Sequence, residues 1–332
     1  MLWREVVMGS LPELTPGRLL SSWQPDVPAL LLVALLGGLY GWGVLRLRRR
    51  GEPWPAARIV AFAVAGLGAL VVATMSALAV YDRELFWPAA VQNILLDLVA
   101  PLGLALGDPL RLALRALPEP AAARVRRAMT GRLVRLLTFP LVSTVLVLTT
   151  ELTIYFTPYF GTALRIGWLH QLMYLHLLLA GCLFVVPVLT REEALPAWCT
   201  HPVRAALVFL DGIVDAVPGI VIMTHGTLIA GAWYLHHAPS WSPDVQHDQQ
   251  VGGGAMIGIA ELVALPFLLA ILVQWARTER AETVALDRRL DAELVPAAPT
   301  GGSDQESDRV RPWWETENSA VAQRIRQQGP GA

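Results

Sequence analysis

Seven apolar stretches of about twenty residues follow one another along this chain of 332 residues. A helix needs roughly this length of apolar sequence to cross the hydrocarbon core of a bilayer. Backbone polar groups in a bilayer must be satisfied within the protein, which favours helices for stretches of this length. The sequence therefore predicts an all-α fold, a polytopic integral membrane helical bundle. The seven predicted transmembrane helices are 27–45, 57–80, 88–106, 136–156, 168–189, 203–225 and 251–275.

The composition agrees with a membrane protein. Charged residues make up 16% of the chain, against roughly 25% in soluble domains. The formal net charge is −1, so we expect the lipid bilayer, and no nucleic acid, as a partner. The two cysteines, Cys182 and Cys199, lack the spacing of a metal or redox motif.

The basic residues, all of which are arginine, orient the predicted helices. Cytoplasmic loops carry an excess of basic residues. The segments 46–58, 107–135, 190–204 and 277–289 together hold 18 arginines. The opposite side holds four, namely Arg4, Arg18, Arg83 and Arg165. This imbalance predicts an N-terminus outside and a cytoplasmic C-terminus.

Three regions follow from this topology. Residues 1–26 form an extracytoplasmic N-terminal segment, and residues 27–277 form the seven-helix transmembrane domain. Residues 278–332 form a cytoplasmic tail that we expect to be mostly disordered, because its end is rich in Pro, Gly, Ser, Glu and Gln. Within the loop before the fourth helix, Arg111 and Arg115 lie among leucines, which predicts a short interfacial helix.

Histidine and methionine in the fifth predicted helix suggest a metal site. His170, Met173 and His176 recur at spacings of three, which would place them on one drifting stripe of the helix. Imidazole and thioether ligands suit copper, especially Cu(I). These three residues are the predicted copper site. The competing interpretation is that the histidines are hydrogen-bonded packing groups.

Other polar residues inside the predicted bilayer are candidates because ionisable groups there are costly. A possible additional metal or polar site comprises His225, Met223, Met256, Asp97 and Asp248. Possible proton-carrying or structural carboxylates are Asp211, Asp215 and Glu261. Asp211 and Asp215 are four residues apart and so share a helix face. The chain contains no Ser-His-Asp motif, HExxH motif or P-loop, and we expect no enzymatic activity.

Several ordered motifs lie between Met75 and Trp275. They are Met75-Ser76, Tyr81, Leu85-Phe86, Val91-Gln92-Asn93, Ala100-Pro101, Leu106-Gly107, Asp108-Pro109, Tyr155-Phe156-Thr157-Pro158, Leu179-Ala180-Gly181 and Asp248-Gln249-Gln250 with Gly253 and Met256. This series resembles the CtaG-like cytochrome c oxidase assembly family of bacterial seven-helix membrane proteins.

The resemblance implies a multi-pass protein of the bacterial plasma membrane that acts in haem-copper oxidase assembly. It implies copper delivery to the oxidase, with oxidase subunits as partners. The chain departs from the family pattern, because Ala89, Asn93 and Tyr174 stand where the family has histidines. Two alternative functions therefore stay open. One is a metal or proton-coupled transporter with a polar line through Asn93, Asp97, Asp215 and Glu261, and the other is an assembly scaffold without metal.

Overall fold

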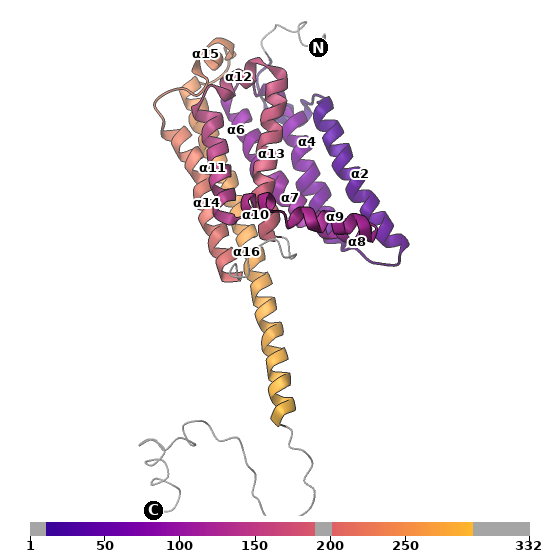
Figure 1. Cartoon of the computed structure of the whole chain (residues 1–332). Helices are drawn as coiled ribbons and strands as arrows, with labels where there is room; N and C mark the ends of the chain where they lie inside the picture. Colours follow the sequence, from indigo (N-terminus) through magenta and orange to yellow (C-terminus); the bar gives the residue numbers. More distant parts are fainter. Residues whose placement is uncertain (1–10, 190–200, 295–332) are drawn as a thin grey trace, which may run out of the picture. The chain divides into compact units, whose positions relative to one another are not determined.

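The structure is a computed structural model that describes residues 11–189 and 201–294. All regular elements in these residues are helical, which confirms the predicted all-α class. The first half of the chain forms α1 (Pro16–Ser21), α2 (Val27–Arg49), α3 (Ala56–Val60), η1 (Ala61–Leu67), α4 (Gly68–Met75), α5 (Ala77–Tyr81), α6 (Phe86–Ile94), η2 (Leu95–Val99), α7 (Ala100–Leu106), α8 (Pro109–Ala116), α9 (Glu119–Met129) and α10 (Arg132–Leu137). The second half forms α11 (Pro140–Phe156), α12 (Tyr159–Arg165), α13 (Gly167–Leu189), α14 (His201–Thr224), α15 (Gly231–His237) and α16 (Val245–Leu294) (Figure 1).

Five continuous helical stretches are long and apolar enough to cross a membrane. They are Val27–Arg49, Ala56–Tyr81, Phe86–Leu106, Gly167–Pro187 and Ala205–Thr224. A sixth candidate is the pair Leu141–Phe156 and Tyr159–Arg165, which is bent by 64°. The structure thus supports five or six spans. The predicted stretch 251–275 lies within α16, and the count of seven and the orientation stay predictions.

The bend in the sixth candidate has a local cause. Thr157 precedes Pro158 and has an extended backbone, with φ −122° and ψ 172°. A proline disfavours the helical conformation in the residue before it, so α11 ends at Phe156. The predicted span 136–156 therefore continues after the bend as α12. The predicted short helix around Arg111 and Arg115 is α8, and two further short helices, α9 and α10, follow it. Its interfacial position stays a prediction.

The stretch Phe86–Leu106 is the central helix of the bundle. In its apolar window, 72% of the residues are buried, whereas in that of Val27–Arg49 only 22% are, so the latter helix lies at the periphery. The middle of the central helix is the π-helical segment η2, and Pro101 follows four residues after Asp97. Since proline has no N–H, Pro101 cannot donate an α-helical hydrogen bond to the Asp97 carbonyl. Gly181 of α13 packs against that carbonyl: a Cβ there would lie 1.7 Å from the Asp97 oxygen.

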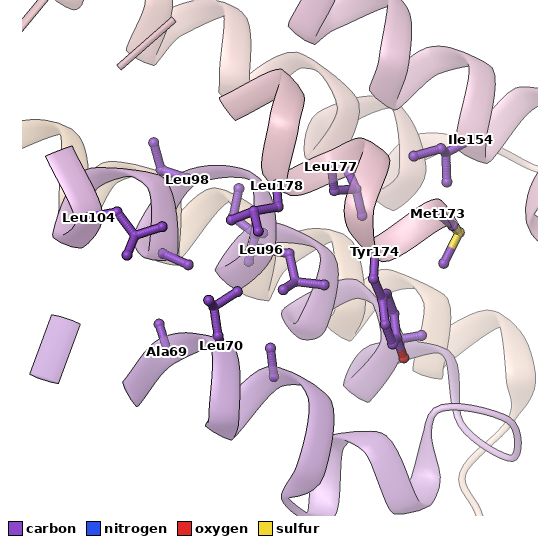
Figure 2. Packing of buried hydrophobic residues seen from close by; sticks show 14 of the residues in the cluster. Ala69, Leu70, Leu96, Leu98, Leu104, Ile154, Met173, Tyr174, Leu177 and Leu178 are labelled. Atoms are coloured by element: carbon purple, nitrogen blue, oxygen red, sulfur yellow. The ribbon is translucent and has the colours of Figure 1, made fainter. Parts of the chain in front are cut away.

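A second close approach joins η1 and α7. A Cβ on Gly103 would lie 2.1 Å from the Gly66 nitrogen, so only glycine fits at this crossing. Around these crossings, apolar residues of α4, η2, α7, α11 and α13 form the core. Figure 2 shows part of it, including Leu70, Leu96, Leu104, Ile154 and Leu177.

The internal contacts of the chain define two units, Met1–Arg277 and Thr278–Ala332. The cavities and the buried polar network described below belong to the first unit. In the second unit, residues 278–294 are helical and form the end of α16. The predicted disorder of the tail concerns mainly residues 295–332, which lie outside the described residues.

Candidate functional site

A polar cavity of about 280 Å³ lies beside the beginnings of α2 and α13 and the turn after α5. Its walls combine two carboxylates, an imidazole, a guanidinium, two amides and a phenol. The side chains are Asp26, Asp82, His170, Arg83, Gln24, Gln171 and Tyr174. A cavity lined by polar side chains at the ends of membrane helices can bind a polar group of a ligand or a partner.

Asp82 is the centre of this cavity and is only 3% exposed. Its Oδ2 accepts a hydrogen bond from the Tyr174 hydroxyl at 3.0 Å, and His170 Nε2 lies 3.5 Å from the same oxygen. The Asp82 backbone carbonyl accepts a hydrogen bond from the Tyr234 hydroxyl at 2.8 Å. Burial, followed by the Asp82 charge, raises the pKa of Tyr234 well above its ordinary value. Asp82 therefore connects α13 and α15 to the end of α5.

The loop before α2 forms another wall of the cavity. Asp26 caps α2 by accepting a hydrogen bond from the Ala29 amide at 2.9 Å, and its other oxygen accepts one from the Gln171 side chain. The backbone amide of Gln24 donates a hydrogen bond to the Met75 carbonyl at 2.8 Å. These bonds hold the loop against α4 and α13, so the polar groups around His170 are pre-positioned.

The beginning of α16 closes the bundle next to this cavity. Asp248 accepts hydrogen bonds from the amides of Phe86 at 2.6 Å and Trp87 at 3.4 Å. The N-cap residue of α6, Leu85, has no side-chain cap of its own, so Asp248 caps α6 from another helix. Burial raises the pKa of Asp248, while these two amides lower it.

Gln249 binds the turn between α14 and α15. Its Oε1 accepts a hydrogen bond from the Ile229 amide at 2.7 Å, and its Nε2 donates to the Ile222 carbonyl at 3.1 Å. The pair Asp248-Gln249, which the sequence offered as part of a resemblance, thus fastens α6, α14 and α16 to one another. This gives Asp248 a structural role in the described residues.

Alanine in place of Asp248 is expected to lower the free energy of unfolding by about 2 kcal/mol, because the buried Phe86 amide and the half-buried Trp87 amide lose their acceptor. Thermal or denaturant unfolding of the purified protein would measure the loss. Asp244→Ala is the matched control: Asp244 also accepts from two amides, those of Gln246 and His247, but it is exposed to solvent. Equal destabilisation by the two substitutions would contradict the capping role.

The structure does not bring the three predicted copper ligands together. His170 faces the polar cavity, whereas Met173 is 1% exposed and lies in the hydrophobic core. His176 Nε2 lies 3.2 Å from the Thr150 hydroxyl of α11. Residues six apart on an α-helix are separated by roughly 120° around its axis, which explains the different neighbours.

The other predicted candidates are also dispersed. Asp97 is 4% exposed within η2, Met256 is buried in the core, and Met223 is 38% exposed. His225 is exposed, with its ring centroid 5.6 Å from that of Phe156. Within residues 11–189 and 201–294, no three His, Cys, Asp or Glu side chains gather closely enough to hold a metal ion.

The predicted carboxylates and the transporter line are placed as follows. Asp211 and Asp215 lie on α14, and their side chains are outside the described set. Glu261 is exposed, whereas Asn93 is buried and donates a hydrogen bond to the Tyr155 hydroxyl at 2.9 Å. Asn93 and Glu261 therefore have different surroundings.

Residues that sequence reasoning missed provide most of the cavity. Asp82, Asp26 and Gln171 carry its hydrogen bonds, and two of them lie in turns that hydropathy places outside the helices. A signal was present for Asp82, because it directly follows an apolar helix and lies among the charged residues Asp82-Arg83-Glu84. Tyr174, which stands where the resemblance implies a histidine, donates a hydrogen bond to Asp82.

Comparison with known proteins places these residues in a wider group. The family model for the cytochrome c oxidase caa3 assembly factor matches residues 38–278. Proteins of Mycobacterium bovis and Mycobacterium tuberculosis, both described as uncharacterised, are each 31% identical over 290 residues, which are 85% of this chain and 43% of theirs. An uncharacterised protein of Mycobacterium leprae is 29% identical over 282 residues, or 83% of this chain and 42% of its own. The chain thus spans less than half the length of these curated relatives. No solved structure matches the chain.

Proposed function

Because this chain belongs to the cytochrome c oxidase caa3 assembly factor family, we propose that it assists the assembly of a haem-copper cytochrome c oxidase in a bacterial plasma membrane. The observation that carries the proposal is the match itself, which extends over residues 38–278, from the middle of α2 to about two thirds of the way along α16. The family is one of assembly factors, and we propose no catalytic step. The partners would be one or more oxidase subunits.

The polar cavity around Asp82 and His170 is the proposed working site. It lies at the end of the bundle that the arginine distribution predicts to be outside. Its two carboxylates are held by hydrogen bonds from Tyr174 and Ala29, and its imidazole lies 3.5 Å from Asp82, so it presents the same polar arrangement to each partner that approaches. A rigid arrangement costs less conformational entropy on binding than a mobile one.

Copper enters this proposal as cargo of the protein. His170 faces the cavity beside the carboxylate of Asp82, and both groups are chemically able to contact a copper ion. Met173 and His176 lie elsewhere, so the three predicted ligands do not form one ligand set. Copper delivery would therefore use His170 together with ligands that the oxidase subunit supplies.

A metal-free scaffold is the second candidate. Its support comes from the three positions where family histidines are absent, because Ala89, Asn93 and Tyr174 are all buried. Asn93 and Tyr174 also form hydrogen bonds within the bundle, to Tyr155 and Asp82. In this version, the cavity binds a polar group of the oxidase subunit directly.

One set of variants tests the function and separates its two versions. A strain that lacks the gene is complemented with wild type, His170→Ala, His176→Ala or His236→Ala, and assembled oxidase is measured by haem absorbance and cytochrome c oxidation. Cu(I) binding by the purified proteins is measured in parallel. We expect His170→Ala to lower assembled oxidase by roughly tenfold and to remove copper binding. The exposed His236 on α15 is the matched control and is expected to have no effect.

Each outcome has a distinct meaning for the proposal. Loss of oxidase in His170→Ala without any change in copper binding supports the scaffold over copper delivery. Loss of copper binding in His176→Ala, with copper binding kept in His170→Ala, would overturn the assignment of copper to the cavity. Normal oxidase levels in the strain without the gene would overturn the assembly function.

A further inference from the structure

A second cavity lies near the C-terminal end of α2, at the opposite end of that helix from the polar cavity. It is apolar and has a volume of about 430 Å³, within the range of roughly 300–1,000 Å³ that small-molecule sites occupy. Its walls come mainly from α2 and α8, including Leu39, Trp42 and Leu112, with further residues from η1, α7 and α13. The cavity is thus an apolar space between helices that an acyl chain can enter.

A basic recess adjoins this apolar cavity. It has a volume of about 260 Å³ and is lined by Trp42, Leu45, Arg46 and Arg49. Trp42 lines both spaces, so the two adjoin each other along α2. The guanidinium carbon of Arg46 lies 5.2 Å from the centre of the Trp42 ring, a cation–π contact.

The two arginines of the recess carry uncompensated positive charge. Arg58 forms an ion pair with Asp108 and Arg115 forms one with Glu52. In the part of the chain that the structure describes, neither Arg46 nor Arg49 has a carboxylate partner. An anion in the recess would supply the missing negative charge.

We propose that these adjoining spaces hold one anionic phospholipid, with an acyl chain in the apolar cavity and the phosphate against Arg46 and Arg49. Tryptophan prefers the level of the lipid headgroups, so Trp42 places the arginines at the depth of a lipid phosphate. A zwitterionic lipid would gain less here, because its own ammonium group already compensates its phosphate. The proposal is independent of the oxidase function, because it concerns the other end of α2.

The headgroup is tested with the full-length protein in detergent. Phosphatidylglycerol or phosphatidylcholine with identical acyl chains is titrated in, and bound lipid is counted by native mass spectrometry. We expect roughly tenfold tighter binding of phosphatidylglycerol to the wild type, and no preference in the double variant Arg46→Gln/Arg49→Gln. Arg132→Gln/Arg135→Gln removes two exposed arginines of α10 at the same spacing and is expected to keep the preference.

The apolar cavity, which is proposed to hold the acyl chain, is tested by its own matched pair of variants. Leu39 is 60% exposed and lines the apolar cavity, whereas Leu35 is 58% exposed one turn earlier on α2 and lines none of the cavities described here. Leu39→Trp fills the cavity and is expected to weaken the binding of both lipids, and Leu35→Trp is expected to leave it unchanged. Equal binding of the two lipids by the wild type would overturn the proposal. So would an equal loss of preference in the two arginine double variants, which would indicate a diffuse basic surface.

Discussion

Leucine in place of Gly181 is expected to abolish the folded helical bundle. Already at Cβ, the new side chain would lie 1.7 Å from the Asp97 carbonyl oxygen and 2.8 Å from Pro101 Cγ. The first of these atoms is backbone of the central helix, so no rotamer change relieves the clash. Overpacking a well-packed core costs about 1–3 kcal/mol, and a clash with backbone adds to that, so we expect about 3 kcal/mol or more. Size-exclusion chromatography of the extracted protein measures the folded fraction.

Gly38→Leu is the control for this substitution. Gly38 lies on the exposed side of α2, and a Cβ there meets nothing within 4 Å. Leucine also has a higher helix propensity than glycine, so this variant is expected to fold as well as the wild type. Similar yields of monodisperse Gly181→Leu and Gly38→Leu would show that α13 does not pack against η2 as described.

Alanine in place of Asp82 is expected to give the second largest effect, a loss of about 3 kcal/mol in the free energy of unfolding. The Tyr174 hydroxyl loses its buried acceptor, and His170 loses the carboxylate 3.5 Å from its Nε2. Leaving buried polar groups without their partner is costly, because each was desolvated to form the interaction. Thermal or denaturant unfolding in detergent would measure the change, and Asp82→Asn, which keeps one acceptor oxygen, should lose less.

A surface carboxylate provides the comparison for Asp82. Glu119 forms an ion pair with Arg126 at 2.9 Å, but both side chains are more than half exposed, at 75% and 54%. Exposed ion pairs contribute little to stability, so Glu119→Ala is expected to change the free energy of unfolding by less than about 0.5 kcal/mol. If Asp82→Ala also changed the free energy of unfolding by less than about 0.5 kcal/mol, the central position of Asp82 in the polar network would be contradicted.

The membrane helices could be predicted from sequence because their length is set by the bilayer. The predicted span 57–80 compares with Ala56–Tyr81 in the structure, and 88–106 compares with Phe86–Leu106. Hydropathy averages over many residues, so it could not detect the bend at Thr157-Pro158. It also could not detect the π-helical segments, which change the backbone hydrogen bonding without changing the apolar composition.

The candidate site could be predicted only in part. His170 was identified from its residue type, and it faces the polar cavity. His176 was grouped with His170 because of its spacing, but it does not line the cavity. Spacing alone does not determine which neighbouring helix each side chain contacts. The capping of α6 by Asp248 joins residues 162 positions apart. Such a contact depends on how the helices pack, and a single sequence carries no local sign of it.

The segment η2 has a consequence for how the central helix can tolerate insertions and deletions. One turn of π-helix accommodates an extra residue compared with an α-helix. Loss of one residue from Leu95–Val99 would therefore convert this turn into regular α-helix and leave the helical phase after it nearly unchanged. Loss of one residue between Ala100 and Leu102, which is already α-helical, would instead rotate Gly103 by roughly 100° about the axis and away from its crossing with Gly66. The central helix can thus lose a residue from its π-helical turn and keep the packing of α7, but not from the turn that follows.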